Sequence, residues 1–168
     1  MTAAVERLAR HAIETRFVDL PAATVAAAKT FILDSIGAGI AGSGSVFADA
    51  VLRTAGGWGA GGDATVWGSG VRLPAASAAL VNGFQIHGQE FDCVHERAVV
   101  HPMATILAVA LAAAERQGGV SGAELLVAVT VAVDIAVTLG VASRSGLRFF
   151  RPGTAGGFGA TAAAARLM

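Results

Sequence analysis

Apolar residues recur every three or four positions along most of this 168-residue sequence, a period typical of helices that bury one face. The first such segment predicts a helix from Thr2 to about Thr15, and Pro21 suits the first turn of a second helix that runs through Ile36. Glycines at positions 37, 39, 42 and 44 are expected to loosen and end this second helix. The N-terminal part of the chain therefore predicts two helices joined by a short turn.

Strand-like residues are scarce and gather in one place. Ser45 can cap a short third helix that reaches about Ala55, after which glycine dominates the sequence. Ala-Thr-Val-Trp-Gly at 64–68 then has the composition of a strand. A strand this short, without an obvious partner, does not define a sheet, so it leaves the helical interpretation unchanged.

The second half of the chain carries clear helix-start signals. Pro74 and Pro102 each suit the start of a helix, where proline is favoured. Ser121 and Glu124 form a capping box ahead of a long apolar run. The helices expected here cover 75–87, 102–117, 121–142 and 154–168. No internal repeat or linker is evident, so the sequence predicts one all-α domain over residues 1–168.

Composition narrows the function classes. The chain is 54% hydrophobic and 14% charged, and its net charge is zero, so it lacks the basic clusters with which proteins bind nucleic acid. Its single cysteine, Cys93, excludes an internal disulfide. The N-terminus has charges within its first apolar turns and does not resemble a secretory signal, which makes a cytoplasmic location the expectation.

Hydropathy raises the question of a membrane. The mean hydropathy is +0.63, and residues 125–142 are apolar apart from two threonines, a glycine and Asp134. A spanning helix needs about 20 apolar residues, and an acid at its centre is costly. We therefore expect this segment to be a core helix and the protein to have no membrane partner.

Candidate chemistry is concentrated between Gln85 and Pro102. This stretch holds three of the four histidines and three of the twelve acidic residues. His87 and Glu90 are three positions apart, so at a helix end they would share a face. His101 precedes a proline and is expected just before a helix N-terminus, where free N–H groups attract anions. An imidazole base and an acid near an anionic substrate are what proton abstraction with loss of a leaving group requires.

Three alternative roles for this stretch remain open. The histidines and acids fit a solvated loop between two helices, since connecting segments are usually polar and exposed. They are also metal ligands by type, but His87, His95 and His101 lack the His-x-x-x-His spacing of helical zinc motifs, so we expect no metal. Cys93, paired with a nearby histidine, is a possible nucleophile.

A second polar segment follows the long apolar helix. Arg144, Arg148 and Arg151 fall within eight positions, and a glycine-rich run from Gly153 enters the last helix. Arginine matches carboxylate geometry, and a glycine-rich turn before a helix offers backbone donors to an anion. A surface loop with solubilising arginines explains the same residues equally well.

Five short segments, in their order along the chain, resemble those of a known protein family. They are Ala-Leu-Val-Asn-Gly at 79–83, Glu-Phe-Asp-Cys-Val-His-Glu at 90–96, Ala-Val-Val-His-Pro at 98–102, Ser-Gly-Ala-Glu-Leu-Leu at 121–126 and Phe-Arg-Pro-Gly-Thr at 150–154. Together they resemble the N-terminal helical domain of the MmgE/PrpD family, and the resemblance runs from about Phe17 to the last residue. This family includes 2-methylcitrate dehydratase and cis-aconitate decarboxylase.

The resemblance implies a lyase that needs no metal or other cofactor, acts on a small tricarboxylate-like acid and commonly forms a homodimer. The family's acidic motif and its His-Pro pair map onto Glu90 and His101, which become the candidate catalytic residues. Asp92 and His95 are then expected to shape the substrate pocket. The family's His-Pro-Thr-Gly-Thr segment maps onto 151–154, so Arg151 and Thr154 join them as candidate substrate-binding residues.

The sequence departs from the family pattern at three of these positions. Glu90 replaces the more usual Asp, Cys93 replaces the second Asp of the same motif, and Arg151 replaces the usual His. These departures affect residues that the resemblance places around the substrate. The substrate therefore need not be 2-methylcitrate.

The resemblance leads to one main hypothesis and two alternatives. The main hypothesis is a hydro-lyase that eliminates water from a 2-methylcitrate-like hydroxy acid by acid–base catalysis. The alternatives are decarboxylation of a cis-aconitate-like acid and a non-catalytic helical binding or assembly module. Family members continue with further helices and an α+β lid domain. We therefore expect these 168 residues to be the N-terminal part of an enzyme and to be inactive alone.

Overall fold

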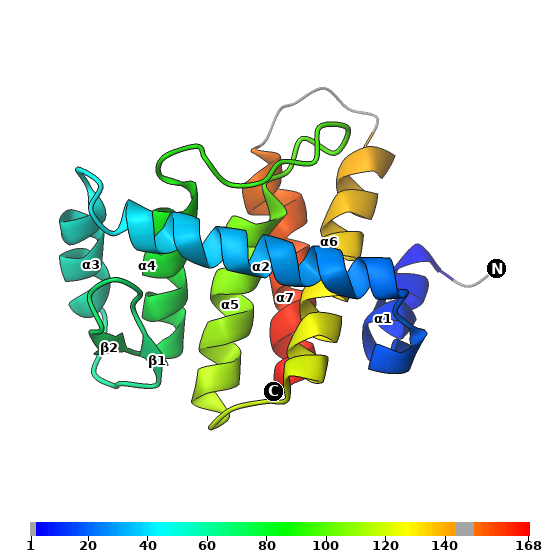
Figure 1. Cartoon of the computed structure of the whole chain (residues 1–168), viewed down its shortest axis with the longest axis horizontal. Helices are drawn as coiled ribbons and strands as arrows, with labels where there is room; N and C mark the ends of the chain where they lie inside the picture. The colour runs from blue at the N-terminus through cyan, green and yellow to red at the C-terminus, as the bar shows by residue number, and fades with distance from the viewer. Residues whose placement is uncertain (1–2, 144–149) are drawn as a thin grey trace.

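The computed structural model describes residues 3–143 and 150–168, and this part of the chain is mainly helical. Helices α3, α4, α5, α7 and α6 lie side by side, in that order, in one layer (Figure 1). Their bounds are Ala48–Gly56, Ala75–His87, Pro102–Arg116, Arg151–Leu167 and Gly122–Ala142, respectively. The all-α fold class expected from the sequence is confirmed.

Two further helices complete the described fold. α2 (Ala22–Gly42) runs across one face of the layer, over α4, α5 and α6 (Figure 1). α1 (Ala4–Glu14) packs against α6 and α7 at one edge, and a 3-10 turn (Phe17–Asp19) leads from α1 toward α2. The His11 Nε2 atom lies 3.1 Å from Asp134 Oδ2, which ties α1 to α6.

Local start signals predict α4, α5 and α6 correctly, whereas α7 begins at Arg151 instead of residue 154, so the glycine-rich run lies inside this helix and not in a turn before it. α4 has the bounds that the sequence predicts, and α5 begins at Pro102 as expected. The Ser121 hydroxyl accepts a hydrogen bond from the Glu124 backbone N–H at 3.2 Å, which confirms Ser121 as the cap of α6. Thr2, the predicted cap of the first helix, lies outside the described residues.

The second helix ends within the glycine-rich stretch as predicted, but it stays regular through the first of these glycines, which has a packing reason. α2 continues through Gly37 and Gly39 to Gly42. Where α2 meets α4, a Cβ atom on Gly42 would stand 1.9 Å from the Gln85 backbone oxygen. Glycine lets the two backbones approach each other, and the resulting tertiary contact outweighs its poor helix propensity.

Ser45 does not cap the third helix, which is a second correction. α3 begins only at Ala48, after a turn in which the Ser45 carbonyl accepts from the Ala48 N–H at 3.1 Å. The strand-like segment does find a partner, because β1 (Ala64–Thr65) pairs antiparallel with β2 (Arg72–Leu73). This hairpin is too small to change the fold class.

Small residues set the spacing between the helices. A Cβ atom on Gly159 would lie 2.5 Å from the Ala132 oxygen, where α7 meets α6. One on Gly83 would lie 2.9 Å from the Ala104 oxygen, where α4 meets α5. The alanine- and glycine-rich composition therefore serves close helix packing. Larger buried side chains fill the space between α5, α6 and α7, among them Met103, Ile106, Leu107, Val129 and Leu167.

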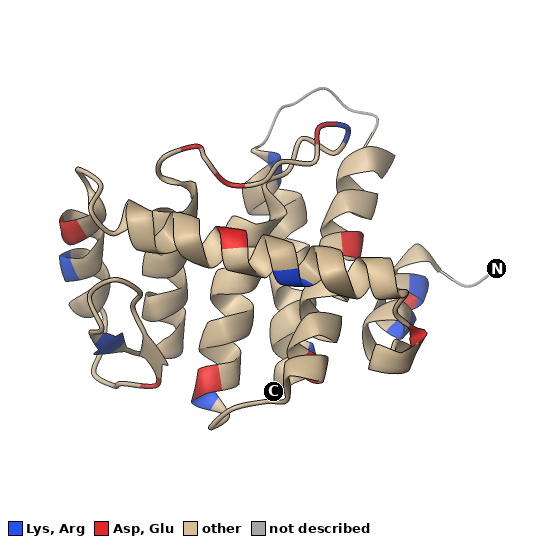
Figure 2. Ribbon diagram, in the orientation of Figure 1, with Lys and Arg blue, Asp and Glu red and all other residues tan. Residues whose placement is uncertain are grey.

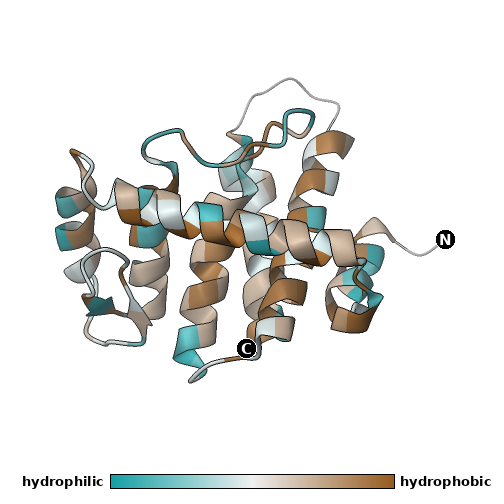
Figure 3. Ribbon diagram, in the orientation of Figure 1, coloured by the Kyte–Doolittle hydropathy of each residue, from teal (hydrophilic) through white to brown (hydrophobic). Residues whose placement is uncertain are grey.

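α2 and α6 are both long and apolar enough to cross a membrane by length and composition. Half of the most apolar window of α6 is buried, as expected of a core helix. Hydrophobic positions recur along α5 and α6 (Figure 3), and charged residues lie on loops, near helix ends and also within α2 and α6 (Figure 2). The packing of α6 thus agrees with its interpretation as a core helix.

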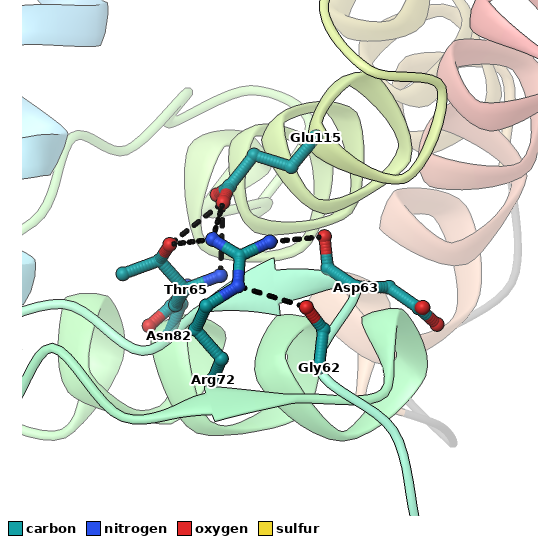
Figure 4. A network of polar contacts seen from close by, with 6 residues as sticks. All are labelled: Gly62, Asp63, Thr65, Arg72, Asn82 and Glu115. Atoms are coloured by element: carbon teal, nitrogen blue, oxygen red, sulfur yellow. Dashed lines mark hydrogen bonds and ion pairs between the residues drawn. The ribbon is translucent and has the colours of Figure 1, made fainter.

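A polar network fastens the β-hairpin to the end of α5 (Figure 4). Arg72 donates to the backbone oxygens of Gly62 and Asp63, and its Nη1 lies 3.3 Å from Glu115 Oε2. The same Glu115 oxygen accepts from the Thr65 backbone N–H at 3.1 Å and from the Thr65 hydroxyl at 2.7 Å. One carboxylate therefore satisfies donors from both strands at once.

We expect Arg72→Ala to lower the free energy of unfolding by about 1–2 kcal/mol, because several hydrogen bonds of a half-exposed charged group are lost together. Urea denaturation followed by circular dichroism measures this change. Arg53→Ala removes an exposed arginine from α3 and should cost less than about 0.5 kcal/mol. Equal losses in the two variants would contradict a stabilising role for the network.

Candidate active site

The candidate site lies on the loop that joins α4 to α5, at one edge of the helix layer (Figure 1). His87 is the last residue of α4. His101 occupies the N-cap position of α5, with Pro102 in the first turn. The prediction that His101 stands at a helix N-terminus is therefore confirmed, and both histidines are placed by helix ends.

Asp92 lies between these two histidines. Its Oδ1 atom is 3.0 Å from His87 Nδ1, in hydrogen-bond geometry, and 3.3 Å from His101 Nδ1. The Asp92 side chain is fully buried, whereas the side chains of His87 and His101 are 24% and 21% exposed. The two imidazole centroids are 4.7 Å apart. Titratable groups packed together in this way are a common feature of acid–base sites.

Two polar atoms of this cluster make no hydrogen bond within the described part of the chain. Among the described residues, Asp92 Oδ2 and His101 Nδ1 are buried and have no hydrogen-bond partner. The His101–Asp92 approach is therefore an ion-pair distance without the angles of a hydrogen bond. Buried polar atoms without partners are costly, and in a native fold they call for an explanation such as a catalytic role.

Glu90 forms the solvent-facing side of the cluster. Its side chain is 73% exposed, and its Oε1 atom lies 3.4 Å from His87 Nε2, as the three-residue spacing predicts. The φ angle of Glu90 is +53°, in the left-handed region, which costs about 1–2 kcal/mol for a residue with a Cβ atom. Strain of this kind is often retained at functional sites. Among the contacts of the described residues, Glu90 meets His87 and not His101.

His95 supports the loop. It is exposed, its Nδ1 atom accepts from the Ala98 backbone N–H at 3.2 Å, and its backbone pairs with that of Val100. Ala98 and Val100 are fully buried and anchor this turn against the helices. The expected role of His95 in shaping a substrate pocket stays a prediction.

Arg151 also holds the loop in place. Its Nη1 atom donates to the Ala98 oxygen at 3.1 Å and to the Gly140 oxygen at 3.2 Å, so it joins the loop to the end of α6. Thr154 is exposed, and its hydroxyl donates to backbone oxygens in the first turn of α7. The substrate-binding roles expected of Arg151 and Thr154 stay predictions. Arg144 and Arg148 lie outside the described residues.

A groove of about 780 Å³ opens beside the cluster, between α4, α5 and α7. Most of its lining residues are alanine, glycine and larger apolar side chains. His87 and Glu90 also line it, as does Phe150, whose ring centroid is 6.1 Å from that of His87. A small acid in this groove would therefore meet titratable side chains at the end formed by His87 and Glu90.

The same cluster has the composition of a metal site. Within the described residues, His87, Asp92 and His101 offer donor atoms that all lie within 4.8 Å of one another. Imidazole and carboxylate ligands of this kind suit zinc. However, the two Nδ1 atoms converge on one carboxylate oxygen, and hydrogen bonding with ion pairing accounts for that arrangement. The absence of a metal cofactor stays a prediction.

Cys93 is poorly suited to act as a nucleophile. Burial raises the pKa of its thiol above the ordinary value, and the neighbouring Asp92 charge raises it further. Since the thiolate is the reactive form, both effects lower the reactivity of Cys93 at neutral pH. The structure therefore disfavours the cysteine-nucleophile alternative.

We expect iodoacetamide to alkylate Cys93 more slowly at pH 8 than it alkylates the same cysteine in the urea-unfolded chain. The raised pKa predicts that the rate in the folded chain continues to climb at pH values where an ordinary cysteine has already levelled off. Mass spectrometry of timed samples measures both rates. Alkylation in the folded chain that is as fast as in the unfolded chain would contradict this prediction.

His87 is the residue whose importance the sequence does not reveal. In the sequence it is one member of a histidine-rich stretch, without an assigned role. The spacing to Glu90 is the available signal, and it correctly indicates a shared face at the helix end. The contact with Asp92 depends on how the loop folds back, which no periodic pattern encodes.

Comparison with known proteins identifies a family and several related sequences. The sequence model of the MmgE/PrpD N-terminal domain matches residues 6–168. The chain is 32% identical over 148 residues to a cis-aconitate decarboxylase of Mus musculus and 33% identical over 148 residues to one of Homo sapiens. It is 31% identical over 130 residues to a cis-aconitate decarboxylase-like protein of Aspergillus oryzae.

These matches cover most of the chain but a minor part of the relatives. The mouse and human alignments each include 83% of this chain, and the fungal alignment includes 74%. They include 30%, 31% and 27% of the respective relatives. The chain thus spans about 30% of the length of the curated relatives that it matches.

Proposed function

The chain belongs to the MmgE/PrpD family, and we propose that it supplies the N-terminal part of a lyase that acts on a small tricarboxylic acid. The observation that carries this proposal is the cluster around Asp92, where two imidazoles meet one buried carboxylate beside a groove. Dehydration of such an acid requires a proton to be removed from carbon and another to be delivered to the leaving hydroxide, and decarboxylation requires a proton to be delivered to carbon. The cluster offers groups of the right type for these proton transfers.

The first candidate reaction is dehydration of a 2-methylcitrate-like hydroxy acid. His101 would accept the proton from carbon, the carbon–oxygen bond would break, and a carbon–carbon double bond would form between the two centres. Glu90, when protonated, would deliver the proton that turns the leaving hydroxide into water. Arg151 and Thr154 are proposed to bind substrate carboxylates, because arginine and hydroxyl groups suit that chemistry.

The second candidate reaction is decarboxylation of a cis-aconitate-like acid. It is favoured by the three relatives, whose names describe cis-aconitate decarboxylases or a protein like them. Here the bond to a carboxylate carbon breaks, carbon dioxide leaves, and the electron pair left on carbon takes up a proton. The same titratable cluster would serve as the donor of that proton.

Substrate turnover by the complete gene product tests the proposal. 2-Methylcitrate, citrate and cis-aconitate are supplied separately, and the release of carbon dioxide distinguishes decarboxylation from dehydration. We expect Glu90→Gln to lower kcat by about 10²-fold or more on the substrate that is used. A protein that turns over none of these acids and binds none of them is a non-catalytic module, and the lyase proposal then fails.

Two controls keep this experiment specific. The 168-residue chain assayed alone is expected to show little or no turnover, because it spans about 30% of its relatives. Treatment with a metal chelator is expected to leave the rate unchanged. Activity that disappears with chelator and returns with zinc would replace the acid–base proposal by a metal-dependent one.

We also propose that the protein associates as a homodimer. Phe31, Leu33 and Ile40 are exposed on α2, with Leu33 73% exposed, and apolar surface of this kind is commonly buried by association. Analytical ultracentrifugation of the complete gene product measures its mass in solution. A monomer at all concentrations would contradict this part of the proposal.

A further inference from the structure

We infer that Asp92 is a positioning residue: it accepts a hydrogen bond from His87 Nδ1–H and holds the Nδ1–H group of His101 at ion-pair distance, which makes His87 the second imidazole available for acid–base catalysis at the site. The catalytic consequence of this inference rests on the proposed function. The assignment of the hydrogens rests on the hydrogen-bond geometry at His87 and on the 3.3 Å distance at His101.

Two imidazole nitrogens approach one acceptor atom, Asp92 Oδ1. This single oxygen lies 3.0 Å from His87 Nδ1 and 3.3 Å from His101 Nδ1. An ionised carboxylate oxygen has lone pairs and no hydrogen, so a ring nitrogen that hydrogen-bonds to it must be the donor. His87 Nδ1, which lies in hydrogen-bond geometry, therefore carries a hydrogen, and we extend the same form to His101 Nδ1, which lies at ion-pair distance from the same oxygen. An unprotonated Nδ1 would instead turn its lone pair toward those of the carboxylate.

Burial of Asp92 supports the same assignment of the hydrogens. Its side chain is fully buried, and within the described part of the chain its Oδ2 atom has no hydrogen-bond partner. A buried carboxylate is stable only when nearby donors compensate for its lost hydration. The two imidazole N–H groups are the donors that approach it. Asp92 and the two rings consequently hold one another in place.

The contact with Asp92 also determines the orientation of the rest of each imidazole ring. With Nδ1 turned toward Asp92, the Nε2 atom of each imidazole lies on the opposite side of the ring. His87 lines the groove, and its Nε2 atom is 3.4 Å from Glu90 Oε1. Packing against His101 at 4.7 Å and against Phe150 at 6.1 Å further restrains the His87 ring. His87 thus presents Nε2 where a bound acid would meet it.

Fixing the tautomer has a chemical consequence. A neutral imidazole has one donor and one acceptor nitrogen, and a hydrogen on Nδ1 makes Nε2 the basic atom. An aspartate that holds a histidine in this way serves the base in the Ser-His-Asp triad. Here one aspartate would serve two histidines, and the Nε2 atom of His87, which lines the groove, would be the one that meets a bound acid.

Nitrogen-15 NMR of the chain labelled at histidine tests the tautomers directly. Long-range proton–nitrogen correlations distinguish a hydrogen on Nδ1 from one on Nε2, and single replacements of the histidines assign the signals. We expect the Nδ1–H form for His87 and His101, and a shift toward the Nε2–H form in Asp92→Asn. A hydrogen on Nε2 alone in either ring of the wild-type chain would overturn the inference.

Glu96→Gln is the matched control, because it removes an exposed acid from the same loop. The tautomers of His87 and His101 should be the same in this variant as in the wild type. If Asp92→Asn does not fold, His87→Asn keeps a side-chain N–H donor for Asp92 and removes the Nε2 atom. His101 should then retain its Nδ1–H form, and its loss would count against Asp92 as the residue that holds it.

Kinetics of the complete gene product provide the functional readout. We expect Asp92→Asn to lower kcat by at least about tenfold with a much smaller change in KM, since a displaced acid–base group loses part of its contribution of about 10²- to 10⁴-fold. Wild-type kcat in an active Asp92→Asn enzyme would overturn the inference and leave the proposed lyase function intact. If none of the three acids is turned over, the function fails, and the NMR result still decides the role of Asp92.

Discussion

Replacing His101 with glutamine is expected to lower kcat by about 10²- to 10⁴-fold, the usual contribution of a positioned general acid or base. Glutamine is polar and similar in reach but cannot take up a proton near neutral pH. His101 makes no side-chain capping bond at the start of α5, and the glutamine amide can still present an N–H group to Asp92, so the fold should be retained. Steady-state kinetics of the complete gene product on 2-methylcitrate and cis-aconitate measures the loss, and circular dichroism checks the fold.

His11→Gln is the control for this prediction. His11 lies on α1, remote from the candidate site in the sequence, and its Nε2 atom contacts Asp134 on α6. Glutamine can still donate a hydrogen bond to Asp134, and kcat should stay close to the wild-type value. Equal losses of kcat in the two variants would indicate a general effect on folding. A wild-type kcat in His101→Gln would remove His101 from the catalytic residues.

Gly42→Ala is expected to destabilise the fold by about 3 kcal/mol or more, because overpacking against backbone atoms has no inexpensive relief. The added Cβ atom would stand 1.9 Å from the Gln85 oxygen, which belongs to the backbone of α4. Only a shift of α2 against α4 can remove this clash, and His87 follows Gln85 by two residues. Thermal unfolding should show a midpoint lower by about 6–12 °C at this chain length.

Gly37→Ala is the matched control on the same helix. A Cβ atom on Gly37 would have no neighbour within 4 Å in the structure. Alanine has the higher helix propensity, so this variant should gain about 0.5–1 kcal/mol. A loss of stability in both variants would show that α2 cannot accept side chains for some reason other than the contact with α4. A Gly42→Ala variant as stable as the wild type would contradict the described crossing.

The helices that the sequence predicts correctly are those whose start signals lie within a few residues of the helix start. α4 and α5 are predicted well because proline at the start and apolar periodicity within each helix are local features. The cap of α6 is predicted for the same reason, since Ser121 and Glu124 are three residues apart. None of these features requires knowledge of a distant part of the chain.

The predictions that were wrong or incomplete concern contacts between separate segments of the chain. Glycines from Gly37 onward are expected to loosen α2, yet the helix is continuous as far as Gly42, the point at which α2 touches α4. The segment at 64–68 has no obvious partner in the sequence, although β2 pairs with it in a short hairpin. In both cases the deciding contact comes from residues that local propensity does not include.

For the candidate site too, the sequence predicts the local features and not the contacts that depend on tertiary structure. The sequence identifies the stretch from Gln85 to Pro102 because titratable residues are conspicuous in an apolar chain, and it places His101 before a helix because proline follows. It does not reveal that Asp92 is buried between His87 and His101. Which side of a loop residue becomes buried depends on how the loop folds over the helices.

By itself the sequence determined the all-α class, most helix starts, the location of the titratable cluster and the resemblance to a family, since each of these depends on residue order over short ranges. The tertiary structure alone decided the continuity of α2 through its first glycines, the contact of Gly42 with α4 and the convergence of two imidazoles on Asp92. These features arise where separate helices and a non-periodic loop meet. Their energies depend on close approach and burial, which a linear pattern does not specify.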